Sequence, residues 1–145
     1  MIIINKTLSL KTGDDLSFCN LTPQIKKFVE DSHIRNGQVL IFTKHTTAGL
    51  RVNEDEKRLF EDIHLFLEKI APKNAKYLHD DIHLRDCPPD ERLNGHAHLK
   101  SLILNTSEII PVIDGKLVLG EWQNLFFIEL DGSRKREVIV QIKGE

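Results

Sequence analysis

The sequence predicts an α+β protein, with helices early in a single compact domain and an antiparallel β-meander late. Apolar side chains recur at helical spacing between residues 54 and 70. After residue 106 come four apolar, β-rich segments, and Asp-Gly pairs at 114–115 and 131–132 favour hairpins between them. The 145 residues suffice for one core of ordinary size and are too few for two. We therefore expect residues 1–145 to form one domain.

The composition argues against several classes of protein. The chain carries 20 basic and 22 acidic side chains, so it offers no basic field for a nucleic-acid backbone. Neither a basic leader nor an apolar run of membrane-spanning length is present, which predicts a cytoplasmic protein without membrane contact. Cys19 and Cys87 lack Cys-x-x-Cys spacing, so we expect reduced thiols rather than a disulfide or a thiolate metal site.

The first part of the chain alternates strands with one short helix. Residues 2–10 alternate loosely between apolar and polar side chains, as a half-buried strand does. Residues 22–33 begin with Thr-Pro, which suits an N-cap and the first helical turn, and carry one apolar face. Residues 37–45 are apolar and rich in β-forming side chains. We expect a central strand there, with His45 at its carboxyl end.

The middle of the chain combines the most regular segment with the least regular one. From Asn53 or Glu54 to Ile70 the pattern predicts an amphipathic helix, with acidic side chains in its first turn. Residues 72–96 carry three prolines and no sustained period. They predict a long loop, which in a small domain is usually functional or disordered. A short helix is expected over residues 97–105.

Polar side chains gather after His45, in the stretch HTTAGLRVNEDE. A strand end close to a helix start would offer free backbone N–H groups to an anion. The same residues also suit ordinary capping, with Thr46 and Thr47 in a turn, Asn53 as the N-cap and Glu54 favouring the helix dipole. Capping is the better interpretation for the two threonines and Asn53. For His45, a capping role and a catalytic role both stay open.

Four more histidines lie in or beside the long loop. His79 and His83 are four residues apart, but no helical period surrounds them, so a shared helical metal site is weakly supported. Asp80 or Asp81 could accept a hydrogen bond from an imidazole and fix its tautomer. A helix start would separate His96 from His98 by about 200° around the axis. We expect one ligand from that pair, and His98 is the better candidate.

Two further candidates lie late in the chain. Arg134 and Arg136 alternate on a strand, so both could hold a phosphate on one face. A solvated sheet edge explains them equally well. Trp122 is more typical of a core, whereas the amide of Gln123 could orient a polar ligand.

Several of these segments together resemble one protein family. They are HTTAGLRVNEDE, LHDD, AHLKS and, above all, SEIIPVIDGKLVLGEWQNL. The last segment carries the signature of the YjbQ family, described as secondary thiamine-phosphate synthase enzymes. Its matching positions are Ser107, Ile110, Val112, Gly115, Gly120, Trp122, Gln123 and Leu125. The resemblance covers nearly the whole chain and implies a homotrimer with a metal ion held by His45, His79 and His98.

The resemblance also implies a reaction. A pyrimidine methyl diphosphate and a thiazole phosphate would combine to give thiamine phosphate and pyrophosphate. A divalent metal, zinc or else magnesium, and arginines would stabilise the departing pyrophosphate. Arg134, Arg136 and Asn53 would then bind the phosphorylated ligand, while Glu54 and Gln123 would orient its organic part.

Two other functions fit the same residues. Three histidines and an open position could activate water for phosphate-ester hydrolysis. A trimer without enzymatic activity could instead bind a metal and a small phosphorylated ligand. Because Glu54 is the only evident general base, hydrolysis is slightly disfavoured.

Overall fold

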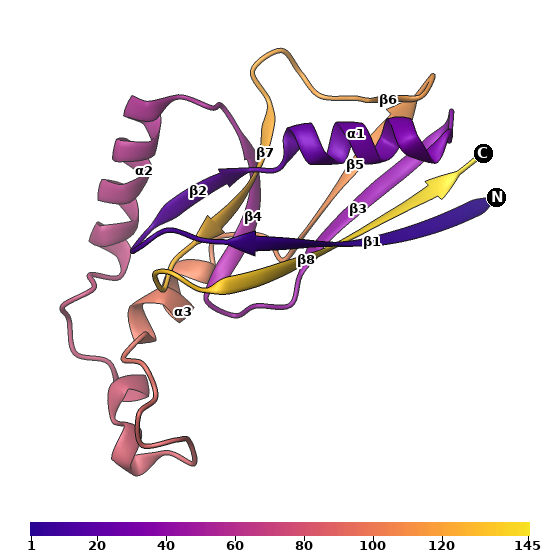
Figure 1. Ribbon diagram of the computed structural model, residues 1–145. Coiled ribbons are helices and arrows are strands. Elements are labelled where there is room, and N and C mark those ends of the chain that lie inside the picture. Colours follow the sequence, from indigo (N-terminus) through magenta and orange to yellow (C-terminus); the bar gives the residue numbers. More distant parts are fainter.

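The computed structural model describes residues 1–145 as two antiparallel sheets with three α-helices (Figure 1). The large sheet has the strand order β1 (Ile2–Lys11), β8 (Lys135–Gly144), β3 (Gly37–Thr43), β5 (Ser107–Ile113) and β6 (Lys116–Leu117). The small sheet has the order β2 (Ser17–Asn20), β7 (Asn124–Glu129) and β4 (Ala48–Asn53). The helices are α1 (Thr22–Ser32), α2 (Lys57–Ile70) and α3 (Gly95–Ser101). None of them is long and apolar enough to cross a membrane.

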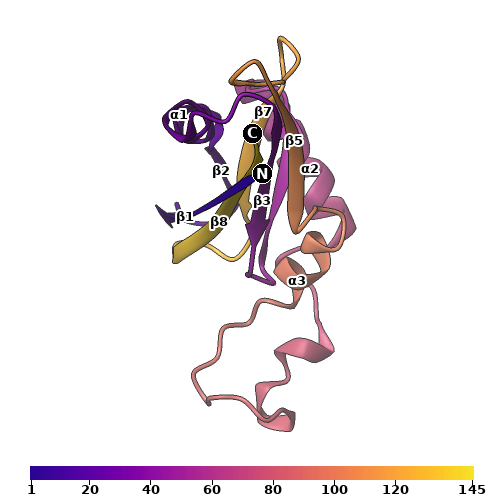
Figure 2. The same cartoon turned by 90° about the vertical axis from the view of Figure 1, so that its right-hand side faces the viewer.

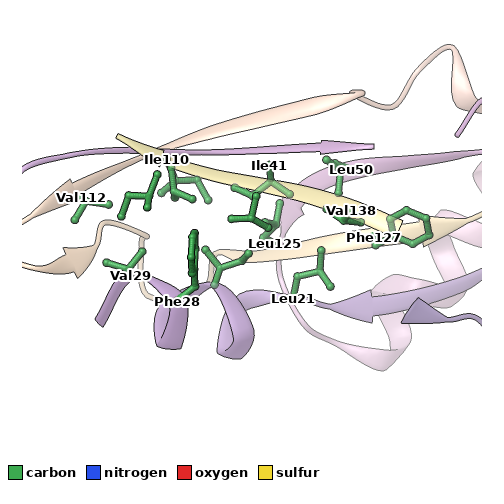
Figure 3. Close-up of a cluster of buried hydrophobic side chains, with 14 of the residues drawn as sticks. Leu21, Phe28, Val29, Ile41, Leu50, Ile110, Val112, Leu125, Phe127 and Val138 are labelled. Atoms are coloured by element: carbon green, nitrogen blue, oxygen red, sulfur yellow. The ribbon is translucent and has the colours of Figure 1, made fainter. Parts of the chain in front are cut away.

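The main core lies between α1 and the inner faces of the two sheets (Figure 3). Helix α1 begins with a proline in its first turn and buries Ile25, Phe28 and Val29 along one face. Val138 from β8 and Phe127 from β7 belong to the same cluster. Because alternate strand residues point to opposite faces, β8 buries every second side chain here and leaves the others on its outer face.

Helix α2 covers the other face of the small sheet, on the side of the strands opposite to α1 (Figure 2). Its N-cap is Glu56, whose carboxylate accepts hydrogen bonds from the backbone N–H groups of Arg58 and Leu59 at 2.8 and 2.7 Å. The predicted cap at Asn53 is therefore wrong. Asn53 instead ends strand β4, which the sequence patterns did not reveal, and Glu54 lies before the helix.

The α+β class is confirmed, but the late strands do not form the expected meander. Asp114-Gly115 does connect β5 to β6 as a hairpin, with Gly115 at a φ of 76°. Asp131-Gly132, by contrast, leads from β7 in the small sheet to β8 in the large one. The reason is burial: residues 125–130 are buried on both strand faces, between α2 and the main core, which suits only the central strand of the small sheet.

The segment between α2 and α3 projects from the body of the molecule (Figures 1 and 2). As predicted, it is mostly irregular, with short 3₁₀ turns at Leu78–Asp80 and Ile82–Leu84. The Asp80 carboxylate ties it to α3 by accepting the Gly95 N–H at 2.9 Å. A Cβ at Gly95 would lie 2.7 Å from the Cβ of Tyr77, so this close approach requires glycine. This contact places His79 next to the start of α3.

Candidate functional site

A polar pocket of about 360 Å³ lies where β3 ends, β8 begins and the projecting segment meets α3. None of its lining residues is hydrophobic. They are Lys44, His45, Thr46, Thr47, His79, Arg85, Glu91, Asn94, His98, Arg134 and Arg136. Four of these side chains are cations and one is a carboxylate, and three of the cations pair with carboxylates: Lys44 with Glu137, Arg134 with Asp131 and Arg136 with Glu129.

The pocket brings together the three histidines that the sequence singled out. His45 follows β3, His79 lies in the first 3₁₀ turn and His98 lies in α3. The rings of His79 and His98 have their centroids 4.5 Å apart. His96 is buried outside the pocket, with its Nδ1 atom unpartnered, and His83 is exposed. The helical separation of His96 from His98 is therefore confirmed.

His45 has a defined hydrogen-bonding role. Its Nε2 atom accepts the backbone N–H of Glu137 at 3.0 Å. Burial, reinforced by the nearby Arg136 guanidinium, lowers the pKa of His45 below 6.5. The neutral ring therefore carries its proton on Nδ1, because Nε2 is used as the acceptor. In this tautomer the remaining nitrogen is a hydrogen-bond donor, which suits an anion better than a metal ion.

His79 and His98 form a different arrangement. Burial, followed by the proximity of His79, lowers the pKa of His98, which keeps its imidazole neutral near pH 7. Neutral imidazoles are the form that binds metals. His79 and His98 are thus the two expected ligands whose rings lie next to each other. No group of three His, Cys, Asp or Glu side chains is placed to hold a metal ion.

Arg136 lies at the base of the pocket and is 5% exposed. Its Nε and Nη2 atoms donate to the two carboxylate oxygens of Glu129 at 2.7 and 2.6 Å, and Nη2 also reaches the Thr47 hydroxyl at 2.8 Å. Thr12 donates to the same carboxylate. Although burial alone would raise the pKa of Glu129, the hydrogen bonds from Arg136 and the backbone hold it below its usual value. Arg136 is therefore not the solvated sheet-edge arginine that the sequence also allowed.

Arg134 is the more accessible of the two arginines, with a side chain 31% exposed. It pairs with Asp131, whose side chain is 5% exposed and also accepts a hydrogen bond from the Asn94 amide at 2.9 Å. Arg134 precedes β8, whereas Arg136 lies within it, yet both line the polar pocket. Their binding of phosphate stays a prediction.

Sequence reasoning missed four charged or amide residues of the pocket. Lys44 pairs loosely with Glu137 at 3.5 Å on the surface, and Arg85 donates to the backbone carbonyl of His79 at 2.6 Å. Glu91 and Asn94 complete the set. Arg85, Glu91 and Asn94 lie in the long irregular segment, and that position was the only sequence signal for them. Nothing local in the sequence indicates which of its polar residues turn inward.

The structure does not bring Asn53, Glu54 and Gln123 to the polar pocket. Strand β4 begins beside the pocket and carries Asn53 at its far end, about 16 Å away at the usual rise of a strand. Gln123 lies next to the strand partner of Asn53, and its Oε1 atom accepts the backbone N–H of Gly120 at 2.8 Å. Within one chain these residues cannot contact a ligand held by the histidines.

Asp80 and Asp81 do not take the expected role either. Neither carboxylate accepts a hydrogen bond from the His79 ring, and Asp80 accepts the backbone N–H of Gly95. Asp80 therefore positions His79 indirectly, by holding the projecting segment against α3. Trp122, expected in the core, is 66% exposed.

The fold and the pocket together define an α+β protein in which one polar pocket brings cationic side chains next to a pair of histidines. Residues 6–145 match the family described as UPF0047 protein YjbQ-like, and the chain belongs to this family. A UPF0047 protein of Archaeoglobus fulgidus is 42% identical over 134 residues, which are 92% of this chain and 97% of that protein.

Solved structures agree with this assignment. A YbjQ-like protein of unknown function from Sulfolobus solfataricus superposes with a TM-score of 0.87 at 35% identity, covering 99% of both chains. An uncharacterised YjbQ/UPF0047 family protein from Clostridium acetobutylicum gives 0.83 at 37% identity, covering 95% of this chain and 99% of its own.

Proposed function

We propose that the protein binds phosphorylated small molecules in the polar pocket and catalyses a thiamine-phosphate synthase-like transfer. One observation carries the proposal: a pocket without apolar lining gathers four cationic side chains around a histidine pair. A diphosphate needs such a surface, because its charge must be neutralised both on binding and on departure. The choice of thiamine precursors rests on the family resemblance.

In the proposed reaction, the thiazole nitrogen attacks the methylene carbon of the pyrimidine methyl diphosphate. A carbon–nitrogen bond forms, the carbon–oxygen bond breaks, and pyrophosphate leaves with the electron pair. Lys44 and Arg134 stabilise the developing charge at the pocket surface, and Arg136 does so from its base. His45 adds a neutral N–H donor. The step needs no protein nucleophile.

An adjoining groove supports binding of the organic part. It has a volume of about 670 Å³ and shares Lys44, His45, Thr46 and His98 with the polar pocket. It adds the apolar side chains of Phe42, Leu99 and Leu102. A substrate with its phosphates in the polar pocket could thus rest a ring on apolar side chains. Such a division of polar and apolar contacts is usual in small-molecule sites.

The proposal includes a divalent metal, zinc or else magnesium, held by His79 and His98. When bound there, the ion supplies positive charge beside the departing pyrophosphate. Two protein ligands leave further coordination positions to water or phosphate oxygens.

We also propose a homotrimer. The expected reason, uncovered strands NLFFIEL and EVIVQI, does not hold: the first is buried within the chain, and Val138, Val140 and Ile142 of the second are 0% exposed. The outer face of the large sheet gives a better one, since Ile109 and Ile113 on β5 are 58% and 54% exposed and Phe42 on β3 lies diagonal to Ile109. Exposed apolar surface of this kind marks association.

The decisive experiment incubates the purified protein with both thiamine precursors and, separately, with single phosphate esters. Thiamine phosphate formed together with an equal amount of pyrophosphate supports the proposal. Hydrolysis of single esters would instead favour a phosphatase, for which Glu91, the one carboxylate lining the pocket, is the candidate base. Anion binding without turnover would leave a non-enzymatic binding protein.

A further inference from the structure

A second cavity, of about 180 Å³, lies against the small sheet beneath α2 and shares no lining residue with the polar pocket. On this face β7 presents Phe126 and Ile128, against which side chains of α2 pack. The neighbouring β4 presents Gly49, Arg51 and Asn53. Leu104 packs closely against Gly49, and the space lies beside Arg51 and Asn53. We call this space the apolar cavity.

The wall of the apolar cavity is aromatic. The rings of Phe18 and Phe60 stack with their centroids 4.3 Å apart, and Phe126 stands edge-on to both, at 6.3 and 5.4 Å. Nine of its eleven lining residues are hydrophobic. A dry cavity of about 150 Å³ lined by aliphatic and aromatic side chains is known to accept benzene. The apolar cavity therefore has the size and chemistry for one six-membered aromatic ring.

A cation stands at the edge of this apolar space. Arg51 is exposed and donates one hydrogen bond, from Nη1 to the Asn105 side-chain oxygen at 3.1 Å. The Asn105 amide in turn donates to Glu108 at 2.8 Å, but Arg51 itself forms no ion pair. A guanidinium has five N–H donors in a fork that matches a carboxylate. Most of these donors are free for a ligand.

We propose that the apolar cavity binds a small aromatic carboxylate, with its ring against Phe126 and its carboxylate on Arg51. A purely apolar molecule would leave the guanidinium unused, and an inorganic anion would leave the aromatic wall unused. Only a ligand with both features matches the whole site. This binding is separate from the proposed transferase activity, because the apolar cavity and the polar pocket share no lining residue.

The test titrates 3-phenylpropionate into the full-length protein while the methyl signals of Ile63, Leu67 and Ile128 are followed by NMR. Its uncharged amide, 3-phenylpropanamide, is the matched ligand. We expect saturable shifts with both compounds and about tenfold tighter binding of the acid, from its charge-assisted hydrogen bonds. Arg51→Gln is expected to equalise the two affinities, whereas Arg58→Gln, an exposed arginine on α2 outside the cavity, keeps the difference. Saturating pyrophosphate leaves both affinities unchanged.

Three results would overturn the inference. The first is the absence of methyl shifts at millimolar ligand. The second is equal binding of acid and amide by the unaltered protein. The third is a change in the methyl signals that depends on protein concentration and not on ligand concentration. It would mean that a second copy of the chain covers the cavity. Because Arg51 is exposed, its substitution tests the site without disturbing the packing that α2 provides.

Discussion

The guanidinium of Arg136 is buried against the carboxylate of Glu129, which is 0% exposed and belongs to the other sheet. Removing one partner leaves an uncompensated buried charge, which costs about 3–5 kcal/mol. We predict that Arg136→Ala lowers the free energy of unfolding, measured in urea, by that amount. Arg134→Ala is expected to cost less, because its side chain is 31% exposed and its partner Asp131 keeps the hydrogen bond from Asn94. Equal losses would contradict the structural role of Arg136.

Arg134 and Lys44 offer the most accessible charges of the polar pocket. We predict that Arg134→Ala or Lys44→Ala weakens the binding of inorganic pyrophosphate about tenfold or more, because each removes a charged hydrogen bond. Calorimetry at fixed ionic strength measures the effect. Lys27→Ala, on the exposed face of α1, is the control and is expected to bind normally. Unchanged binding by both pocket variants would place the anion elsewhere.

The histidine pair predicts an asymmetry in metal binding. We expect His79→Ala and His98→Ala each to lower the zinc content of the purified protein, because their rings approach each other. His45→Ala is expected to retain zinc, since its Nε2 atom is occupied by the Glu137 N–H. Elemental analysis after equilibration with zinc gives the answer, with His83→Ala as the exposed control. Loss of zinc in His45→Ala would show that His45 is a third ligand, as the family resemblance implies.

Burial lowers the pKa of His45, His96 and His98 below 6.5. Below that pH the unfolded chain binds more protons than the folded one, so the free energy of unfolding rises with pH. We predict full stability above about pH 6.5 and a progressive loss as the pH falls toward the folded-state pKa values. Urea titrations with a chelator present, from pH 7.5 to 5, measure this loss. His96→Gln is expected to flatten the dependence.

The exposed face of β5 predicts self-association, and the family resemblance predicts that three copies associate. Light scattering is expected to give three times the subunit mass, and Ile109→Lys is expected to dissociate the trimer by placing a charge in the interface. Lys143→Ala, an exposed position at the end of β8, serves as the control. A monomer at micromolar concentration, or a trimer unaffected by the lysine, would refute this arrangement.

Some elements of the fold were accessible from local patterns. The helical period of residues 57–70 predicted α2, and the proline-rich composition of residues 72–96 predicted the irregular segment. The same reasoning placed His98 apart from His96, because a helix start turns them to different sides. Local signals were weaker for β4, where glycine, arginine and asparagine alternate with apolar side chains, and this strand was missed.

The sequence by itself determined the α+β class, the α2 helix, the β5–β6 turn and the family, because periodicity and turn chemistry act over a few residues. Tertiary structure decided that β7 and β8 join different sheets, that Arg136 is buried on Glu129, and that Gln123 lies far from the histidines. Those outcomes depend on which strand faces pack together, and packing joins residues distant in sequence. The polar pocket likewise collects side chains from residues 44–47, 79–98 and 134–136, which no local pattern connects.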